Sequence, residues 1–193
     1  MAKLLETAKP VIIDFFDSQK VPVFKHSHLL RMFNENQDTW PLPRSMNFSS
    51  FVNFLADECH LGIHRAEFPY RPETLYVWRD VSIYCAASHL KKNAYLCHYS
   101  AMSVHELTDQ DPTMIYINQE QRVQPKPEGD LYQHVVDRVF KGKQRASKNI
   151  AEFMNYNITV VNGKNTQRHG VIETFDVNGH PISTTGITRT LID

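Results

Sequence analysis

The sequence has few of the features that mark disordered, membrane or secreted proteins. It contains only 7 glycines in 193 residues and no segment of low complexity, which indicates a chain that is folded over most of its length. No apolar run approaches the roughly 20 residues that a membrane-spanning helix requires. The first residues, Met1–Phe16, include no apolar core that leads to a small-residue cleavage site. We therefore expect neither a membrane span nor a signal peptide.

Cysteine and net charge are low as well. The three cysteines, Cys59, Cys85 and Cys97, are an odd number, which favours buried thiols in a reducing compartment such as the cytoplasm over a disulfide framework. The 21 basic residues are balanced by 21 acidic ones, which argues against binding to a polyanion through overall charge. Residues 1–80 carry nine Lys or Arg and ten Asp or Glu, a net charge of −1. Any DNA contact in this half must come from a local cluster.

The spacings of known metal-binding motifs are missing. The sequence has no Cys-x-x-Cys and no His-Glu-x-x-His. His60 and His64 are four residues apart, but Gly62 between them is expected to end a helix, so the two rings should not share a face. Two Cys-His pairs consist of adjacent residues, which cannot clamp one ion as spaced pairs do. We expect no structural metal.

Catalytic motifs are missing too, because the sequence has no P-loop, no Gly-x-Gly-x-x-Gly and no Gly-x-Ser-x-Gly elbow. Ser100 lies near His98, but a role as the N-cap of a helix explains it better. Cys85 and Cys97 fit inert buried thiols. We expect no catalytic residue and no cofactor, although an enzyme whose groups converge from distant parts of the chain stays open.

The first 80 residues predict three helices followed by a hairpin. Apolar residues recur at helical spacing in three stretches, and two strand-like stretches follow them. We expect a first helix over 8–19, a second helix with Ser27 as its N-cap, and a third helix over Phe48–His60. Two strands, Ile63–Phe68 and Thr74–Trp78, should follow. Pro10 would lie in the first turn of the first helix, where its missing N–H costs nothing. This order is that of a winged helix-turn-helix.

The helix over Phe48–His60 is the candidate recognition helix, because the polar residues near its N-terminus have short side chains. Asn53 suits an adenine edge, and serine side chains suit bases or phosphates. An arginine before the helix and two on the hairpin would contact the DNA backbone or minor groove. The predicted DNA-binding set is Arg44, Asn47, Ser49, Ser50, Asn53, Arg65 and Arg71. The alternative is an ordinary amphipathic helix with a polar outer face.

The remaining residues, 81–193, predict a small mixed α/β domain. A helix is expected over 81–93, another from Ser100 to Thr108, and a strand over Thr113–Ile117. Residues 131–140 fit either a helix or a strand. Further strands are expected near 157–161, 171–175 and 181–184, with hairpin turns at Asn162-Gly163 and Asn178-Gly179.

A basic run follows the middle of the chain, with five cationic residues in eleven: Arg138, Lys141, Lys143, Arg145 and Lys148. Such a run can contact flanking DNA, RNA or an acidic partner. A solvated loop between core elements is the other interpretation, and we favour it slightly.

Two segments resemble the AbiEi antitoxin family. The first is Tyr99-Ser100-Ala101, then Leu107-Thr108, Gln110, Pro112 and the strand Met114–Ile117, which is similar to that family's central motif. The second is Gly179 through Arg189-Thr190-Leu191-Ile192-Asp193, which is similar to a strand that leads into a helix start in the same family. The first 80 residues fit the winged helix that such proteins carry in front.

The resemblance implies a bacterial antitoxin of a type IV toxin–antitoxin system linked to abortive phage infection. Such a protein represses its own operon and opposes a nucleotidyltransferase-like toxin. The expected partners are double-stranded operator DNA, a cognate toxin and a second copy of the chain. The first half here is not basic, and the chain ends where the family usually continues, so we expect it to be the front of a longer protein. The alternative is the DNA-recognition part of a nuclease or another phage-defence effector.

Overall fold

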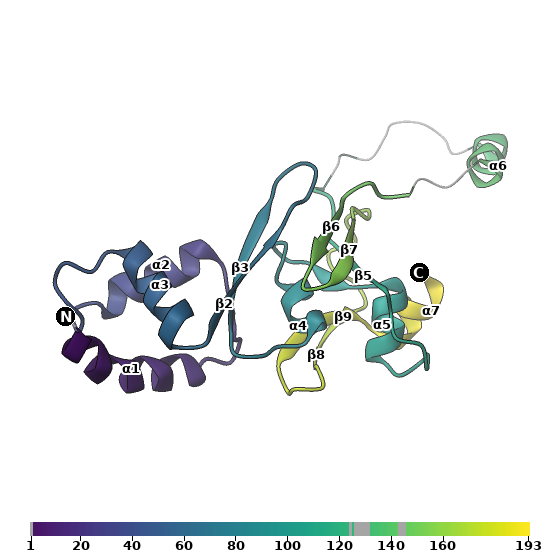
Figure 1. Ribbon diagram of the computed structural model, residues 1–193. Coiled ribbons are helices and arrows are strands. Elements are labelled where there is room, and N and C mark those ends of the chain that lie inside the picture. The colour runs from purple at the N-terminus through teal and green to yellow at the C-terminus, as the bar shows by residue number, and fades with distance from the viewer. Residues whose placement is uncertain (1, 124, 126–131, 143–145) are drawn as a thin grey trace.

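The structure is a computed structural model that describes residues 2–123, 125, 132–142 and 146–193 (Figure 1). These residues form an α+β fold, as predicted, with seven helices and two sheets. None of the described helices is both long and apolar enough to cross a membrane. All three cysteines are free and buried.

The first half contains three helices and a three-stranded antiparallel sheet. Its elements are α1 (Ala2–Asp17), β1 (Val23–Phe24), α2 (His26–Asn36), α3 (Phe48–Glu58), β2 (Leu61–Ala66) and β3 (Glu73–Trp78). The strand order is β1-β3-β2, and β2 pairs with β3 from Leu61 opposite Trp78 to Ala66 opposite Glu73. The predicted order of helices and hairpin is confirmed.

Three local predictions in this half are wrong. Helix α1 begins at Ala2 rather than at residue 8, so Pro10 lies inside it. The burial of Ala8 and Ile12 on either side of Pro10 in one core compensates for the hydrogen bond that proline cannot donate. The N-cap of α2 is Lys25, not Ser27, and it makes no side-chain cap bond. Gly62 does not end a helix, because it lies in β2.

Aromatic side chains fill the core of the first half. Phe16 stacks on Trp78 with ring centroids 4.8 Å apart, and Trp40 stacks on Phe51 at 5.4 Å. The indole N–H of Trp78 donates to Asp17 Oδ1 at 2.7 Å. This bond and those from Arg79 hold the pKa of Asp17 below its usual value. The core thus fixes where β3 leaves the helices.

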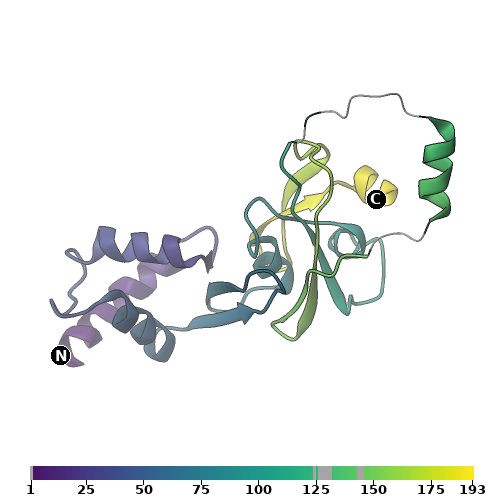
Figure 2. The ribbon, with the colours of Figure 1, turned by 90° about the horizontal axis from the view of Figure 1, so that it is seen from above.

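The second half contains a six-stranded mixed sheet with helices around it (Figure 2). The strand order is β6-β7-β5-β4-β9-β8, with β5 parallel to β7 and β4 parallel to β9. Its elements are α4 (Ile83–Ser88), β4 (Tyr95–Leu96), α5 (His98–Val104), β5 (Met114–Asn118), α6 (Gln133–Lys141), β6 (Ile150–Phe153), β7 (Tyr156–Val161), β8 (Val171–Phe175), β9 (Pro181–Thr185) and α7 (Ile187–Ile192).

Two turn and cap predictions in this half are wrong. Ser100 is not an N-cap, because α5 begins at His98 and the buried Ser100 hydroxyl accepts a 2.8 Å hydrogen bond from the N–H of Tyr116. Asn162-Gly163 does not form a hairpin, because β7 pairs in parallel with β5 and antiparallel with β6. The hairpin around Asn178-Gly179, between β8 and β9, is confirmed. Helix α4 is also shorter than the expected 81–93.

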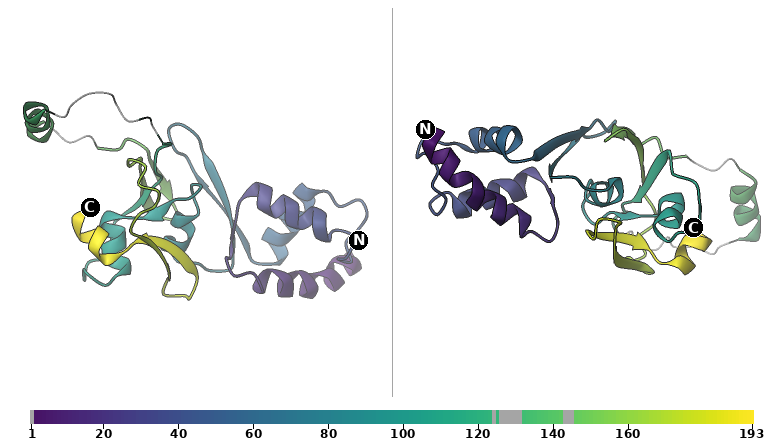
Figure 3. Two further views of the ribbon diagram at one scale, coloured as in Figure 1. Left: turned by 180° about the vertical axis from the view of Figure 1, so that it is seen from behind. Right: turned by 60° about the horizontal axis from the view of Figure 1, so that its bottom comes forward.

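The β2–β3 hairpin supplies side chains to two cores. Trp78 and Tyr76 face the helices of the first half, whereas Leu75 and Val77 belong to the core of the second half. Figure 3 shows the hairpin running from the three helices to the second sheet. Because β3 serves both cores, a domain boundary at residue 80 stays a prediction.

Candidate nucleic-acid interface

Helix α3 presents short polar side chains to solvent near its N-terminus. Ser49, Ser50 and Asn53 are exposed, whereas Phe51 and Leu55 are fully buried on the opposite face. This face matches the arrangement that the sequence predicts for a recognition helix. Its side chains are short enough to let the helix backbone approach a groove closely.

Asn47 has a structural role that the sequence analysis did not assign to it. It is the N-cap of α3, and its Oδ1 accepts a hydrogen bond from the N–H of Ser50 at 2.9 Å. Arg44 lies three residues earlier, exposed, at the edge of a hollow that Asp38 and Trp40 also line. The capped end of α3 thus lies close to one cation.

The other end of α3 is acidic. Asp57 and Glu58 are both exposed in its last turn, and Glu58 pairs with Lys9 at 3.1 Å. Carboxylates repel phosphates, so only the N-terminal half of α3 can lie close to a DNA backbone. The charge gradient along the helix therefore defines one docking direction.

The hairpin tip is held against the second half of the molecule. Phe68 is buried, and the ammonium group of Lys91 lies 4.5 Å from the centre of its ring. Glu73 accepts hydrogen bonds from Lys25 at 2.8 Å and Lys91 at 3.0 Å. Burial raises the pKa of Glu73, but these two ammonium groups outweigh it and the pKa lies below the usual value. The tip is anchored on both sides.

The two hairpin arginines of the predicted set differ in their surroundings. Arg65 forms an ion pair with Glu67 at 2.6 Å, and both side chains are well exposed. Arg71 is exposed in the turn. Within the described side chains up to residue 80, Lys20, Arg44 and Arg71 form no ion pair, whereas the other cations contact carboxylates. Few cations are thus free to meet phosphate.

The predicted basic run is divided between two places. Arg138 and Lys141 lie on α6, a helix with no buried residue that stands apart from the sheets (Figure 1). Lys148 precedes β6 and lines a hollow on the sheet. Lys143 and Arg145 lie outside the described residues. The described part of the run does not form one surface.

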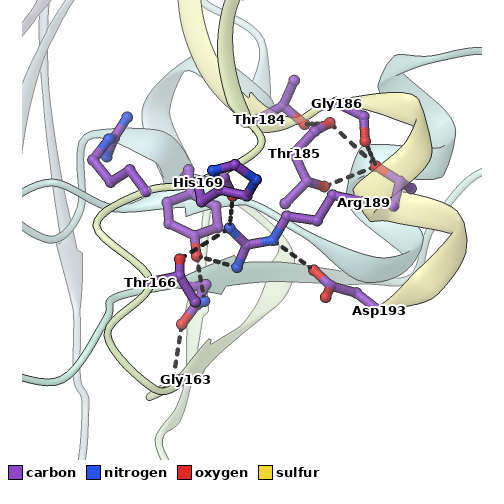
Figure 4. A network of polar contacts seen from close by, with 12 residues as sticks. Gly163, Thr166, His169, Thr184, Thr185, Gly186, Arg189 and Asp193 are labelled. Carbon is purple, nitrogen blue, oxygen red and sulfur yellow. Dashed lines mark hydrogen bonds and ion pairs between the residues drawn. The ribbon is translucent and has the colours of Figure 1, made fainter.

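A polar network that the sequence did not predict surrounds Tyr95 and Arg189, and Figure 4 shows the part of it around Arg189. Arg189 Nη2 donates to the Tyr95 hydroxyl at 2.8 Å, as does Asn118 Nδ2 at 2.7 Å, and the hydroxyl donates to Glu120 at 3.0 Å. The guanidinium groups of Arg168 and Arg189 lie 5.5 and 5.3 Å from the ring centre. Burial and the bond to Glu120 raise the pKa of Tyr95 to about 12.

The network around Tyr95 joins parts of the second half to one another and does not form a binding site. Arg189 also donates to the carbonyl of His169 and pairs with Asp193, so it joins α7 to the loop before β8. The Arg-Thr-Leu-Ile-Asp segment drew attention to Arg189 in the sequence, but the sequence did not show which residues Arg189 contacts. The partners of Arg189 lie on β4, in the loop over 162–170, at Glu120 after β5 and at Asp193 after α7.

Three potential metal ligands meet where α4 contacts the β8–β9 turn. One ligand atom each of Cys85, Asp176 and His180 lies within 4.8 Å of the others. Asp176 is already engaged, because it accepts hydrogen bonds from the Ser82 hydroxyl at 2.5 Å and from backbone N–H groups of the turn. Burial raises the pKa of the Cys85 thiol to about 12. The cluster joins α4 to the turn, and the absence of a structural metal stays a prediction.

His60 and His64 border the same hollow, together with Gly62, Arg79 and Asp80. The two residues do not share a helix, because α3 ends at Glu58 and Gly62 lies in β2. That their rings do not share a face stays a prediction. The one group of three potential metal ligands among the described residues is the cluster at Cys85.

No protein-family model and no curated protein matches this chain. Its function is therefore inferred from its own residues and their geometry.

Proposed function

We propose that this chain is a DNA-binding transcriptional regulator whose first half is a winged helix-turn-helix that reads operator DNA through α3. The observation that carries the proposal is the exposed, short-chained polar face of α3 within the order α1-β1-α2-α3-β2-β3 and the sheet order β1-β3-β2. In a winged helix the last of three helices enters the major groove, and the hairpin lies beside it.

Asn53 is the residue we assign to base readout, because a side-chain amide can make two hydrogen bonds to an adenine edge. Ser49 and Ser50 contact bases or phosphates near the capped end of α3, where the helix dipole favours negative charge. Arg44 contacts the DNA backbone at the capped end of α3, and Arg71 contacts it from the turn of the β2–β3 hairpin. Asn47 acts indirectly, because it holds the first turn of α3 in place.

The low number of free cations predicts how binding responds to salt. Each phosphate contact contributes a slope of about −0.9 to the dependence of log affinity on log salt. With Lys20, Arg44 and Arg71 as the unpaired cations among the described side chains of the first half, we expect a slope of only about −2 to −3 per subunit. Affinity then rests on base contacts and on a second copy of the chain reading the other half-site.

The resemblance to AbiEi antitoxins supports a specific biological role. We propose that the chain represses its own operon by occupying the promoter and opposes a nucleotidyltransferase-like toxin. The second half would contact the toxin, the DNA or a second copy. Function here is binding, so no catalytic step is assigned.

An electrophoretic shift with DNA from upstream of the chain's own gene tests the proposal. We expect retardation at low salt that competitor DNA of unrelated sequence removes only at large excess. The test is repeated with Asn53→Ala and with Asn157→Ala, an equal truncation at an exposed position on β7, as a matched control. If no fragment of the upstream region is retarded by the unaltered chain, the proposal is wrong.

A further inference from the structure

A hollow of about 660 Å³ lies on the second sheet, on the face opposite to the side chains that pack against α4. Strand alternation explains its position. Ile115, Ile117 and Val160 point into the core, so Tyr116 and Thr159 point the other way. The hollow is separate from the polar face of α3, because α3 packs in the core of the first half.

The floor of the hollow is one row of side chains across three strands. Tyr116 of β5 pairs with Thr159 of β7, which pairs with Ile150 of β6. The segment before β6 forms a wall, because Ser147 Oγ donates to the carbonyl of Val160 at 2.6 Å and the N–H of Val160 donates to the carbonyl of Asn149 at 2.9 Å. The floor and the wall are fixed by backbone pairing, so only side chains need to adjust to a ligand.

Two buried polar atoms of the lining residues have no hydrogen-bond partner among the described residues. They are Thr159 Oγ1 and Asn149 Oδ1, and Thr159 is only 5% exposed. Buried polar atoms are almost always satisfied, because an unpaired one loses its hydration without compensation. Both orphan atoms belong to residues that line one hollow. Rotation of the two side chains toward the hollow would let a polar ligand complete them.

The backbone at the edge of the hollow is strained. His98 has φ of 50° at the start of α5, in the left-handed region that side chains other than glycine rarely adopt. Its ring packs edge-on against Tyr116, with centroids 5.9 Å apart. Strain of this kind is retained at ligand sites. His98 is thus held in a conformation that keeps an aromatic pair at the hollow.

The chemistry of the lining restricts the ligand. The described residues that line the hollow include no carboxylate, which disfavours a metal ion or an amine, and Lys148 adds one positive charge. Tyr70, 83% exposed at the hairpin tip, adds a third aromatic ring to those of His98 and Tyr116. Aromatic rings with a few convergent amide and hydroxyl groups and one cation suit a flat heterocycle that carries phosphate.

We propose that this hollow binds a nucleotide whose base carries an exocyclic amino group, with Tyr116 stacking on the base and Lys148 pairing with the phosphate. The amino group donates to Asn149 Oδ1, and the Thr159 hydroxyl donates to the adjacent ring nitrogen. Adenine and cytosine present this donor next to this acceptor, whereas uracil does not. The ligand is either a free nucleotide or an unpaired base of a nucleic-acid strand.

Calorimetric titration of the full chain with AMP, CMP, UMP and a short single-stranded oligo(dA) tests the proposal. We expect saturable binding of AMP and CMP, and binding of UMP weaker by about ten-fold, which is the usual size of one lost pair of base-edge hydrogen bonds. Tighter binding of the oligonucleotide than of AMP identifies a strand as the ligand, and equal binding identifies the free nucleotide. No saturable binding of AMP, CMP or the oligonucleotide overturns the proposal.

Thr159→Val is the decisive variant, because it removes only the orphan hydroxyl and keeps the shape of the side chain. We expect AMP affinity to fall by about ten-fold while resistance to urea is unchanged or higher, since valine leaves no unpaired buried atom. Lys148→Ala should also weaken the binding of AMP. Its matched control is Lys164→Ala, which changes an exposed lysine that does not line the hollow. Unaltered AMP affinity in Thr159→Val contradicts the assignment. The shift with operator DNA is measured on the same variant, so a failure here is distinct from a failure of the function proposed for α3.

Discussion

The two halves of the molecule use polar side chains in opposite ways. In the first half, polar groups lie outside an aromatic core, and Ser49 and Asn53 on α3 face solvent. In the second half, polar groups lie inside, where Tyr95, Asn118 and Arg189 bond to one another. A polar surface left uncovered is available to a partner, whereas a satisfied interior network fixes a shape. The comparison agrees with the proposal that α3 of the first half acts in recognition, whereas the interior network of the second half fixes its shape.

The largest effect should come from a change to the aromatic core of the first half. Phe51→Ala removes a fully buried ring that stacks on Trp40, and we expect the free energy of unfolding to fall by about 3–5 kcal/mol. Urea denaturation followed by fluorescence and circular dichroism measures it. If β3 couples the two cores, both signals shift together. Two separate transitions would show that the halves fold independently.

Arg189→Ala should have the next largest effect and tests whether the second half depends on its polar interior. The side chain is only 17% exposed, and its loss leaves the Tyr95 hydroxyl and the carbonyl of His169 short of a donor. We expect a loss of about 2–3 kcal/mol in unfolding free energy, measured by urea denaturation. Lys164→Ala, which removes an exposed cation nearby, serves as the control and should change stability little. An equal free energy of unfolding for the two variants would mean that the network around Tyr95 does not stabilise the second half.

Asn53→Ala tests the opposite property of the first half, that its outer polar face acts in binding and not in folding. We expect unchanged urea denaturation and weaker operator binding by about 1–2 kcal/mol, because one amide pair to a base edge is lost. Fluorescence anisotropy with labelled operator DNA gives the affinity. A loss of stability without a loss of affinity would reverse the assignment of this face.

The smallest effect should come from Glu73, which joins the two halves through Lys25 and Lys91. Its pKa in the folded chain lies below the ordinary value of 4.5, so its contribution is present above about pH 4.5 and is lost as pH falls through the folded pKa. Glu73→Gln should cost about 1 kcal/mol at pH 7. The difference from the unaltered chain should shrink as the pH falls from 6 to 3. A difference that does not change with pH would show that the carboxylate charge is not what holds the hairpin tip.

The sequence predicted most helices and strands of both halves, because apolar spacing is local information, but it did not predict how the strands of the second half pair. Apolar spacing around Phe51 and Leu55 predicted α3. The second half is ordered by parallel pairings and by contacts between residues far apart, such as Ser82 with Asp176. Periodicity does not encode such contacts, so Ser100 was assigned as a cap when its hydroxyl serves a strand.

The candidate sites divide in the same way. The polar face of α3 follows from helical spacing alone, and Asn53 is exposed where the sequence placed it. The hollow over Thr159 could not be predicted, because it needs the register of three strands and the return of the chain at Asn149. The basic run suggested one surface, but its described members lie on α6 and beside β6.

The alternation of β3 between two cores constrains which changes in chain length this protein can accept. Leu75 and Val77 face one core, and Tyr76 and Trp78 face the other. Adding or deleting one residue within β3 would exchange the two faces, so that each core would receive the side chains shaped for the other. Substitutions at these positions can be compensated one core at a time, but an insertion disrupts both at once. Length variants should therefore be tolerated between the elements and excluded from Glu73–Trp78.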